Sequence, residues 1–492
     1  MKDSTKGLRQ KAASSMFWTA VQRYSMTLVT FIADVVLARL LTPYDFGCIG
    51  MLAIFMIVAE TLIDGGFGAA LIQRKNPTQE DYSTIFFWNL GMAVFLYCIL
   101  FICAPFIAGF YGIPILSSVL RVQGLILFVY AFNIIQLNQL KKRLQFKVLS
   151  IVHLASNIIA LVITITMAYH GLGVWSLVAR HLVAAFITSL VLWFFVKWRP
   201  VLVFSWQSFR ELFGFGFYMF LAHLVTNIST QIQGLLIGKI YKPETMGFYS
   251  KASGTENFAS KSISQVMTQV TYPLYAQVQD DLSAMQNMVK RLTMTLSYLT
   301  FPLLFILLLV AKPLFILLYT EKWLPSVPYF QVLCLAGLGA CLQAVNFQTI
   351  SAIGKSKVTF VWTFVKRIVG IGLIVGGLAI GGMKGLLCGV VLNSWLSYFV
   401  NIGLVSKYVG YKWWRQLWDL FPVTAASMIS AVISYYCLSI FDFTLYVDGL
   451  LKLIIYVLLY MGWSFFFKPE AFVYVREIAK SMISRFFKIS KQ

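Results

Sequence analysis

Acidic residues are scarce in this chain, and so are the patterns that mark an enzyme or a metal site. The 492 residues include 18 Asp and Glu against 40 Lys and Arg, and charged residues make up only 12% of the total. The sequence has no P-loop, no H-E-x-x-H and no G-x-S-x-G, and its four His residues are scattered. The seven Cys residues form no metal-ligand pattern with His. We therefore expect neither an enzyme nor a bound cofactor or metal.

Apolar residues, by contrast, are abundant. They make up 59% of the chain, and the mean hydropathy is +0.78. A helix that crosses a membrane needs about 20 apolar residues. The sequence predicts an all-α polytopic membrane protein with 14 transmembrane helices at 15–40, 45–70, 83–108, 117–140, 147–169, 173–197, 211–239, 245–272, 290–312, 327–352, 357–381, 385–407, 416–440 and 447–467.

The distribution of the basic residues predicts the orientation. Most Lys and Arg lie in the two tails and in alternate loops, and basic loops stay on the cytoplasmic side during insertion. Both termini are therefore expected in the cytoplasm, with the chain in a bacterial inner membrane. The net charge of +22 then reflects loops that face anionic membrane lipids, and we expect no nucleic acid as a partner.

One predicted span, 245–272, is unusually polar, with two Lys, one Glu and many hydroxyl and amide side chains. If it were a loop, the basic loops that follow it would move to the outside, so the alternation of charge favours a span. A helix this polar must face protein or water, and it is expected to line a cavity.

A repeated motif predicts an internal duplication. Arg39 to Gly47 and Lys239 to Gly247 both read basic-x-x-x-Pro-x-x-x-Gly, 200 residues apart. Pro suits the first turn of a helix and Gly allows close packing. We expect two parallel six-helix lobes, 1–204 and 205–408. The segment 409–492 would add helices 13 and 14 and a basic, amphipathic cytoplasmic tail.

Charged residues inside the predicted spans are costly and are candidates for a functional site. Each group also has a structural alternative. Arg23 and the pair Lys366 and Arg367 could reach the inner membrane surface. Glu60 and Asp64 could form ion pairs with lysines of another helix, and His223 could be an ordinary interhelical hydrogen-bonding residue. Eight cations lie inside or at the edges of spans: Arg23, Arg121, Arg180, Lys251, Lys261, Lys366, Arg367 and Lys452.

Several short motifs resemble one transporter family. They include Leu37 to Gly47, Asp64 to Gly68 running into Ile72 to Lys75, Tyr272 to Tyr275, and Pro313-Leu314 before Glu321-Lys322-Trp323. Their order is similar to that in the polysaccharide-export branch of the MOP (multidrug/oligosaccharidyl-lipid/polysaccharide) flippase superfamily, as in Wzx-type lipopolysaccharide and colanic acid exporters. The resemblance implies two six-helix lobes around a central cavity, two extra helices, and transport of a lipid-linked oligosaccharide.

The resemblance does not assign individual residues, so the site prediction rests on residue chemistry. The undecaprenyl-diphosphate oligosaccharide carries phosphates and hydroxyls, which suit cations and amides. The predicted substrate-binding residues are Arg23, Lys251, Lys261, Asn257 and Asn227. The carboxylates predicted to couple transport to an H⁺ or Na⁺ counter-ion are Asp34, Glu60, Asp64 and Glu256. Polysaccharide polymerase machinery is a further expected partner.

Other functions fit parts of the same pattern. A multidrug-type cation antiporter of the same superfamily would have an acidic, aromatic cavity, which the intramembrane lysines disfavour. A lipid II flippase has closely related chemistry and stays open. A scaffold for a glycan-assembly complex, with no transport activity, is an alternative from another functional class.

Overall fold

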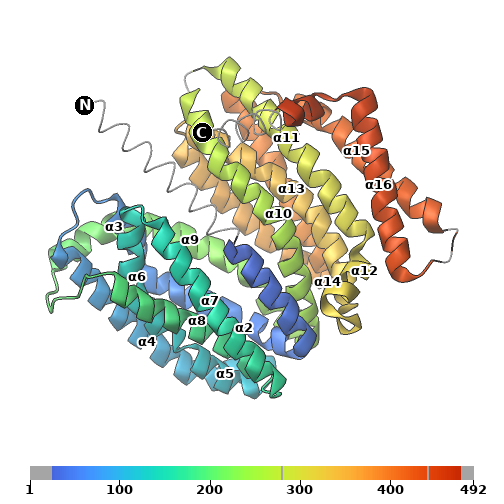
Figure 1. Ribbon diagram of the computed structural model, residues 1–492. Helices are drawn as coiled ribbons and strands as arrows, with labels where there is room; N and C mark the ends of the chain where they lie inside the picture. The colour runs from blue at the N-terminus through green and yellow to red at the C-terminus, as the bar shows by residue number, and fades with distance from the viewer. Residues whose placement is uncertain (1–24, 279–280, 440, 442, 478–492) are drawn as a thin grey trace, which may run out of the picture. The chain divides into compact units, whose positions relative to one another are not determined.

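The computed structural model describes residues 25–278, 281–439, 441 and 443–477 (Figure 1). It gives the backbone alone for Phe215, 261–263, 265–274, 276–277 and 356–357. Every regular element in this part of the chain is a helix, which confirms the all-α prediction for the described residues. The chain divides into two compact units between Ser250 and Lys251.

The first unit begins with a helix over residues 25–40 and ends with the first turns of α10. Its other helices are α2 (Pro43–Asp64), α3 (Phe67–Gln73), α4 (Gln79–Tyr111), α5 (Ile115–Gln123), α6 (Ile126–Lys142), α7 (Phe146–Tyr169), α8 (Val174–Phe195) and α9 (Trp206–Ile240). The second unit contains the rest of α10 (Pro243–Gln277), α11 (Leu282–Leu309), α12 (Ala311–Tyr319), the 3₁₀ turn η1 (Glu321–Trp323), α13 (Ser326–Ala352), α14 (Ser356–Val409), α15 (Trp413–Ser439) and α16 (Leu445–Phe467).

Ten helices among the described residues are long and apolar enough to cross a membrane. The number is eleven if α9, which bends by 56° between Gly214 and Gly216, forms one span. The polar α10 is not in this set, although its 35 residues exceed the length that a span needs. The chain is thus a multi-pass membrane protein.

The α2 helix begins where the first repeated motif predicts. Thr42 is the N-cap and Pro43 the first helical residue. The Asp45 carboxylate accepts a hydrogen bond from the Thr42 backbone N–H at 2.9 Å, and the Thr42 hydroxyl accepts one from the Asp45 N–H. This capping box satisfies N–H groups that have no partner inside the helix. In the second motif, Pro243 likewise begins α10.

The two motifs also contact one another, and they do so reciprocally. A Cβ atom at Gly47 would overlap with the backbone carbonyl of Pro243, and a Cβ atom at Gly247 would overlap with the backbone carbonyl of Pro43. The N-terminal turns of α2 and α10 therefore pack backbone against backbone. Both glycines therefore permit close packing, as the motif predicts.

A break in the second predicted span explains the sequence Asp64 to Gly68. Gly65 and Gly66 have φ values of 53° and 79°, in the left-handed region where glycine is favoured. A Cβ atom at Gly66 would also overlap with the Gly216 carbonyl of α9. The span predicted as one helix is thus two, α2 and α3. The span predicted at 117–140 is also two helices, α5 and α6.

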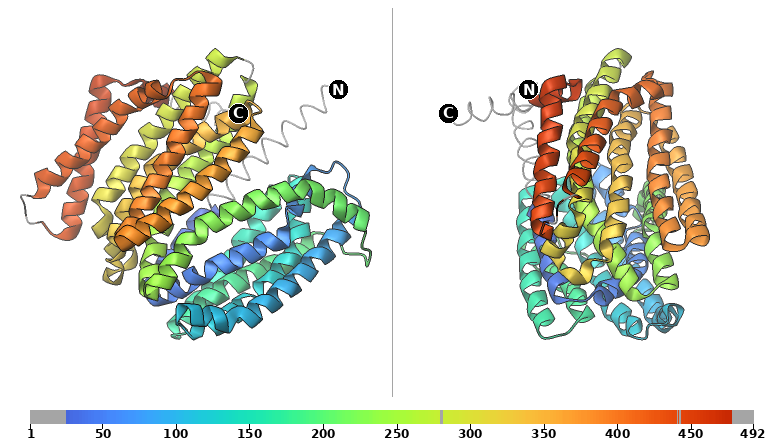
Figure 2. Two further views of the ribbon diagram at one scale, coloured as in Figure 1. Left: turned by 180° about the vertical axis from the view of Figure 1, so that it is seen from behind. Right: turned by 90° about the vertical axis from the view of Figure 1, so that its right-hand side faces the viewer.

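In the second unit, α14 is not a single straight helix, because a turn divides it. Gly381 and Gly382 have non-helical backbone angles, between the spans predicted at 357–381 and 385–407. On either side of the turn, the backbones of Gly377 and Gly385 lie in direct contact. The helices α15 and α16 form a hairpin beside α11 (Figure 2), and the Tyr298 hydroxyl of α11 bonds to the Ser464 hydroxyl of α16 at 2.8 Å.

Candidate functional site

The predicted acidic pair lies at the C-terminal end of α2, one turn apart. Both carboxyl side chains are only partly exposed. The Asp64 carboxylate lies beside the backbone N–H groups of Gly66 and Gly68, at the N-terminus of α3. A carboxylate there is favoured because the N–H groups at the start of a helix carry partial positive charge. Asp64 therefore stabilises the break between α2 and α3.

Side chains from two other helices surround this pair. His223 and Lys141 are electrostatic neighbours of Asp64, and Tyr130 of α6 lies near both carboxylates. The amide of Asn227 donates to the Thr61 hydroxyl at 2.8 Å. The first unit thus brings three predicted residues, Glu60, Asp64 and Asn227, onto adjoining faces of α2 and α9. Tyr130 was not predicted, although the polar run Asn133, Gln136, Asn138 and Gln139 marks α6 as a helix with a hydrophilic face.

A second electrostatic pair in the first unit involves Asp34. Its partner is Arg180 of α8, whose guanidinium also donates to the Thr30 carbonyl at 3.5 Å. The sequence marked Arg180 as an intramembrane cation but gave it no role. Arg23, another predicted substrate-binding residue, lies outside the described residues.

In the second unit, Lys251 lies in a buried aromatic site. Its side chain is 2% exposed, and its ammonium nitrogen is 5.0 Å from the ring centre of Tyr319 and 5.2 Å from that of Trp323. Both rings are fully buried. The Tyr319 hydroxyl is 2.9 Å from the Thr255 hydroxyl. The ring faces attract a cation, so the Glu321-Lys322-Trp323 motif supplies a side chain that holds Lys251 in place.

The other predicted residues of α10 differ in their surroundings. Glu256 is 7% exposed, and its carboxylate occupies the space left by Gly337 of α13, since a Cβ atom there would overlap with it. Asn257 is partly exposed and donates to the Ser253 hydroxyl at 3.1 Å. The side chain of Lys261 is not among those described.

Lys366, for which the sequence left a position at the inner membrane surface open, is buried in the second unit. It is 6% exposed, and it donates to the Asn401 side-chain oxygen at 2.7 Å. Its position near the cytoplasmic end of a predicted span gave no indication of this contact, because Asn401 lies on the other side of the Gly381–Gly382 turn. The pair holds together the two halves of α14.

The arrangement provides charge without an obvious reaction centre. No group of three or more His, Cys, Asp or Glu residues in the described part of the chain could hold a metal ion. The buried Lys251 and Lys366 of the second unit, and the partly buried Arg180 of the first, can bind anionic and hydroxyl-rich groups through hydrogen bonds. A carboxylate such as Glu256 can attract a small cation when it is charged and release it when it is neutral.

Comparison with known proteins gives consistent results. A family model described as polysaccharide biosynthesis protein matches residues 36–328. The lipopolysaccharide biosynthesis protein WzxC of Escherichia coli (strain K12) is 23% identical over 439 residues, covering 87% of this chain and 88% of that protein. The succinoglycan biosynthesis transport protein ExoT of Rhizobium meliloti (strain 1021) is 24% identical over 399 residues, covering 80% and 78%.

Among solved structures, the lipid II flippase MurJ in an inward closed conformation is similar with a TM-score of 0.74. The match covers 92% of this chain and 99% of that one at 14% sequence identity. At this identity the likeness concerns the fold alone.

Proposed function

Given that the chain belongs to the polysaccharide biosynthesis protein family, we propose that it is a flippase for lipid-linked oligosaccharide repeat units used in surface polysaccharide synthesis. The observation that carries this proposal is the similarity over most of the chain to proteins named for lipopolysaccharide biosynthesis and succinoglycan transport. The predicted resemblance to Wzx-type exporters is thus confirmed. Neither the antiporter nor the scaffold alternative is favoured by these relatives.

The physical requirements of transporting such a substrate agree with the features of this chain. The polyisoprenyl chain of the substrate is apolar and stays in lipid, while its diphosphate and sugars must cross the membrane core. Moving such groups through hydrocarbon is very costly unless protein or water solvates them. A polar helix such as α10 reduces that cost, and its buried Lys251 and Glu256 show that this chain keeps charge within the fold.

The architecture that we propose for this transport has 14 transmembrane helices. Eleven of them are the described apolar spans, counting α9 as one span. The helix at residues 25–40 and α10 would add two more, and α14 would count as two spans that meet at Gly381–Gly382. Lobes at 1–204 and 205–408 would alternate between inward-open and outward-open states around a water-filled cavity. The protein would act without enzymatic chemistry, in a bacterial inner membrane.

Within this scheme, residues take roles according to their charge. Lys251, Lys261 and Arg23 would attract the diphosphate, and Asn257 and Asn227 would bind sugar hydroxyls. Asp34, Glu60, Asp64 and Glu256 are the carboxylates available for coupling to H⁺ or Na⁺, because a carboxylate can be neutral in one state and charged in the other. The polymerase that joins the exported units would be a partner on the outer face.

Loss of the protein is expected to trap its substrate on the cytoplasmic side. In a deletion strain, lipid-linked repeat units should accumulate, and they should be detected by mass spectrometry of extracted lipids. A membrane-impermeant sugar-modifying reagent should leave them unmodified in intact spheroplasts. The wild-type gene supplied on a plasmid should reverse both results. If the accumulated units were accessible from outside, the protein would act after translocation and the flippase proposal would be wrong.

The orientation is expected to follow the basic loops. A reporter fused after residue 410 should show cytoplasmic activity, because residues 407–415 include Lys407, Lys412 and Arg415. A reporter fused after residue 443, in a segment without Lys or Arg, should show periplasmic activity. Alkaline phosphatase and green fluorescent protein fusions report opposite sides, so each position has an internal control. Reversal at either position would contradict the proposed topology.

A further inference from the structure

A pocket of about 320 Å³ lies in the first unit, beside the turns that join α3 to α4 and α6 to α7. Three of its lining side chains are cationic, and no lining residue is acidic. The lining residues are Lys75, Asn76, Pro77, Tyr82, Gln139, Lys142 and Arg143.

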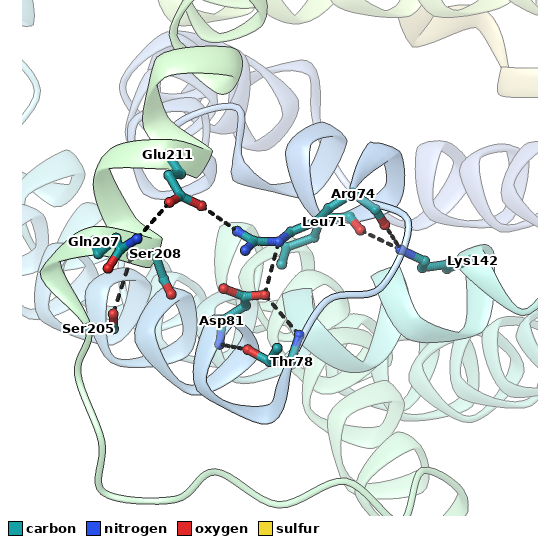
Figure 3. A network of polar contacts seen from close by, with 9 residues as sticks. All are labelled: Leu71, Arg74, Thr78, Asp81, Lys142, Ser205, Gln207, Ser208 and Glu211. Carbon is teal, nitrogen blue, oxygen red and sulfur yellow. Dashed lines mark hydrogen bonds and ion pairs between the residues drawn. The ribbon is translucent and has the colours of Figure 1, made fainter.

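Two basic residues in this region, Arg74 and Lys142, bind to other groups of the first unit (Figure 3). Arg74 forms ion pairs with Asp81 of α4 at 3.2 Å and with Glu211 of α9 at 3.3 Å. Lys142 donates to the backbone carbonyls of Leu71 and Arg74 at the end of α3. A cation is favoured there, because the last carbonyls of a helix have no partner inside it. These contacts hold the pocket wall in place.

The network contains two acidic groups, Glu211 and Asp81, and neither lines the pocket; Asp81 is the one closer to the pocket turn along the chain. It is fully buried, pairs with Arg74, and accepts the Thr78 backbone N–H at 2.8 Å in the capping box of α4. The pocket therefore keeps a net positive charge.

The remaining two cations are available to a ligand. Lys75 and Arg143 are both exposed, and neither makes a hydrogen bond or an ion pair with another residue that the structure describes. Tyr82 and Gln139 add a phenol hydroxyl and a primary amide, which both donate hydrogen bonds. An ammonium, a guanidinium and two neutral donors around one space suit the oxygens of a phosphate group.

The level of the pocket along the helices indicates where that phosphate comes from. Apolar spans end at Gln73 and Lys142, and the next ones begin at Gln79 and Phe146. The pocket thus lies where four span ends meet, which is the level at which lipid head groups are expected. Leu144, directly after Arg143, is 50% exposed, as expected of a side chain that faces acyl chains. Basic pockets between membrane helices at this depth bind anionic head groups.

We propose that this pocket binds the phosphate group of a membrane lipid. The inference rests on the geometry of the first unit and not on which molecule the protein transports. Two lipids carry the required chemistry: an anionic phospholipid and a polyprenyl diphosphate. Binding would tie the two turns to the membrane surface.

The test uses the full-length protein in detergent and in nanodiscs. Native mass spectrometry would measure retention of phosphatidylglycerol, polyprenyl diphosphate and soluble inorganic diphosphate, each added separately. The variant Lys75→Gln/Arg143→Gln removes the two available cations. The matched control, Lys197→Gln/Arg210→Gln, removes one exposed Lys and one exposed Arg of the same unit that do not line the pocket.

The pocket variant is expected to bind one or both lipids about thirty-fold more weakly than wild type, while the control keeps wild-type affinity. The exchange Lys75→Arg/Arg143→Lys should retain binding. Whichever lipid is lost identifies the source of the phosphate. Equal weakening in the pocket and control variants would overturn the proposal, as would unchanged lipid binding or binding of inorganic diphosphate alone. Thermal unfolding of each variant confirms that its fold is intact.

Discussion

Replacing Gly247 with alanine is expected to remove most of the folded protein from the membrane. The added methyl group would overlap with the Pro43 carbonyl, which belongs to the rigid first turn of α2. Backbone atoms cannot rotate away as a side chain can, so the two helices must separate. Overpacking of this kind costs on the order of 3 kcal/mol. The reciprocal variant, Gly47→Ala, should have an equal effect, because it meets the Pro243 carbonyl in the same way.

The control is Gly254→Ala on the same helix. No atom lies within 4 Å of a Cβ atom at this position, and alanine favours a helix by about 1 kcal/mol over glycine. This variant should accumulate at the wild-type level. Fluorescence-detected size-exclusion chromatography of detergent extracts measures the folded fraction of each. A monodisperse Gly247→Ala protein at normal yield would show that the two helices do not depend on this contact.

Neutralising Lys251 is expected to reduce export of the oligosaccharide by at least about tenfold, as for a lost charge-assisted hydrogen bond of roughly 1.5–3 kcal/mol. In Lys251→Gln the protein would keep a polar side chain and lose its interaction with a diphosphate. Lys251→Arg should be milder because it keeps the charge. The exposed residue Lys312 offers a control, since Lys312→Gln removes the same charge from the same unit. Trapped lipid-linked units, normalised to the amount of protein in the membrane, give the measurement.

Because Lys251 also packs on Tyr319 and Trp323, a purely structural role must be separated from a role in transport. Loss of cation–π attraction alone would lower the unfolding temperature and the amount of protein together. A role in transport lowers export at unchanged amount. Cysteine at Asn257, two turns further along α10, should react with a water-soluble thiol reagent if the helix lines a cavity. Normal export by Lys251→Gln together with no labelling at 257 would refute the assignment.

The sequence predicted those features that local chemistry determines. Pro43 of the repeated motif marks the start of α2, and the separate spans predicted at 357–381 and 385–407 flank the turn within α14. The start of α11 was predicted at 290, eight residues late. Asp281 caps this helix by accepting the N–H groups of Ser283 and Ala284, and these bonds lower the pKa of Asp281. Hydropathy detects the apolar part of a helix and misses polar turns that extend beyond it.

The residue types of the candidate site follow from the sequence, but their contacts do not. Charge within an apolar segment is visible in any sequence, and it pointed to Lys251, Glu256 and Asp64. The neighbours of those residues depend on long-range packing. Tyr319 is 68 residues from Lys251, and Gly337 is 81 residues from Glu256. Periodicity and hydropathy carry no information about contacts between residues so far apart in the sequence. The aromatic site around Lys251 could therefore not be predicted.

The contact between the first turns of α2 and α10 has a consequence for the synthesis and insertion of the protein. A membrane protein inserts in the order of its synthesis, and Pro243 leaves the ribosome 200 residues after Pro43. Until α10 arrives, the surface of α2 around Gly47 lacks the helix that packs on it. A nascent chain that ends before α10 would therefore present this surface of small residues to other helices. Release from the insertion machinery before α10 is complete would leave the first unit open to mispairing, so α10 is the helix that completes it.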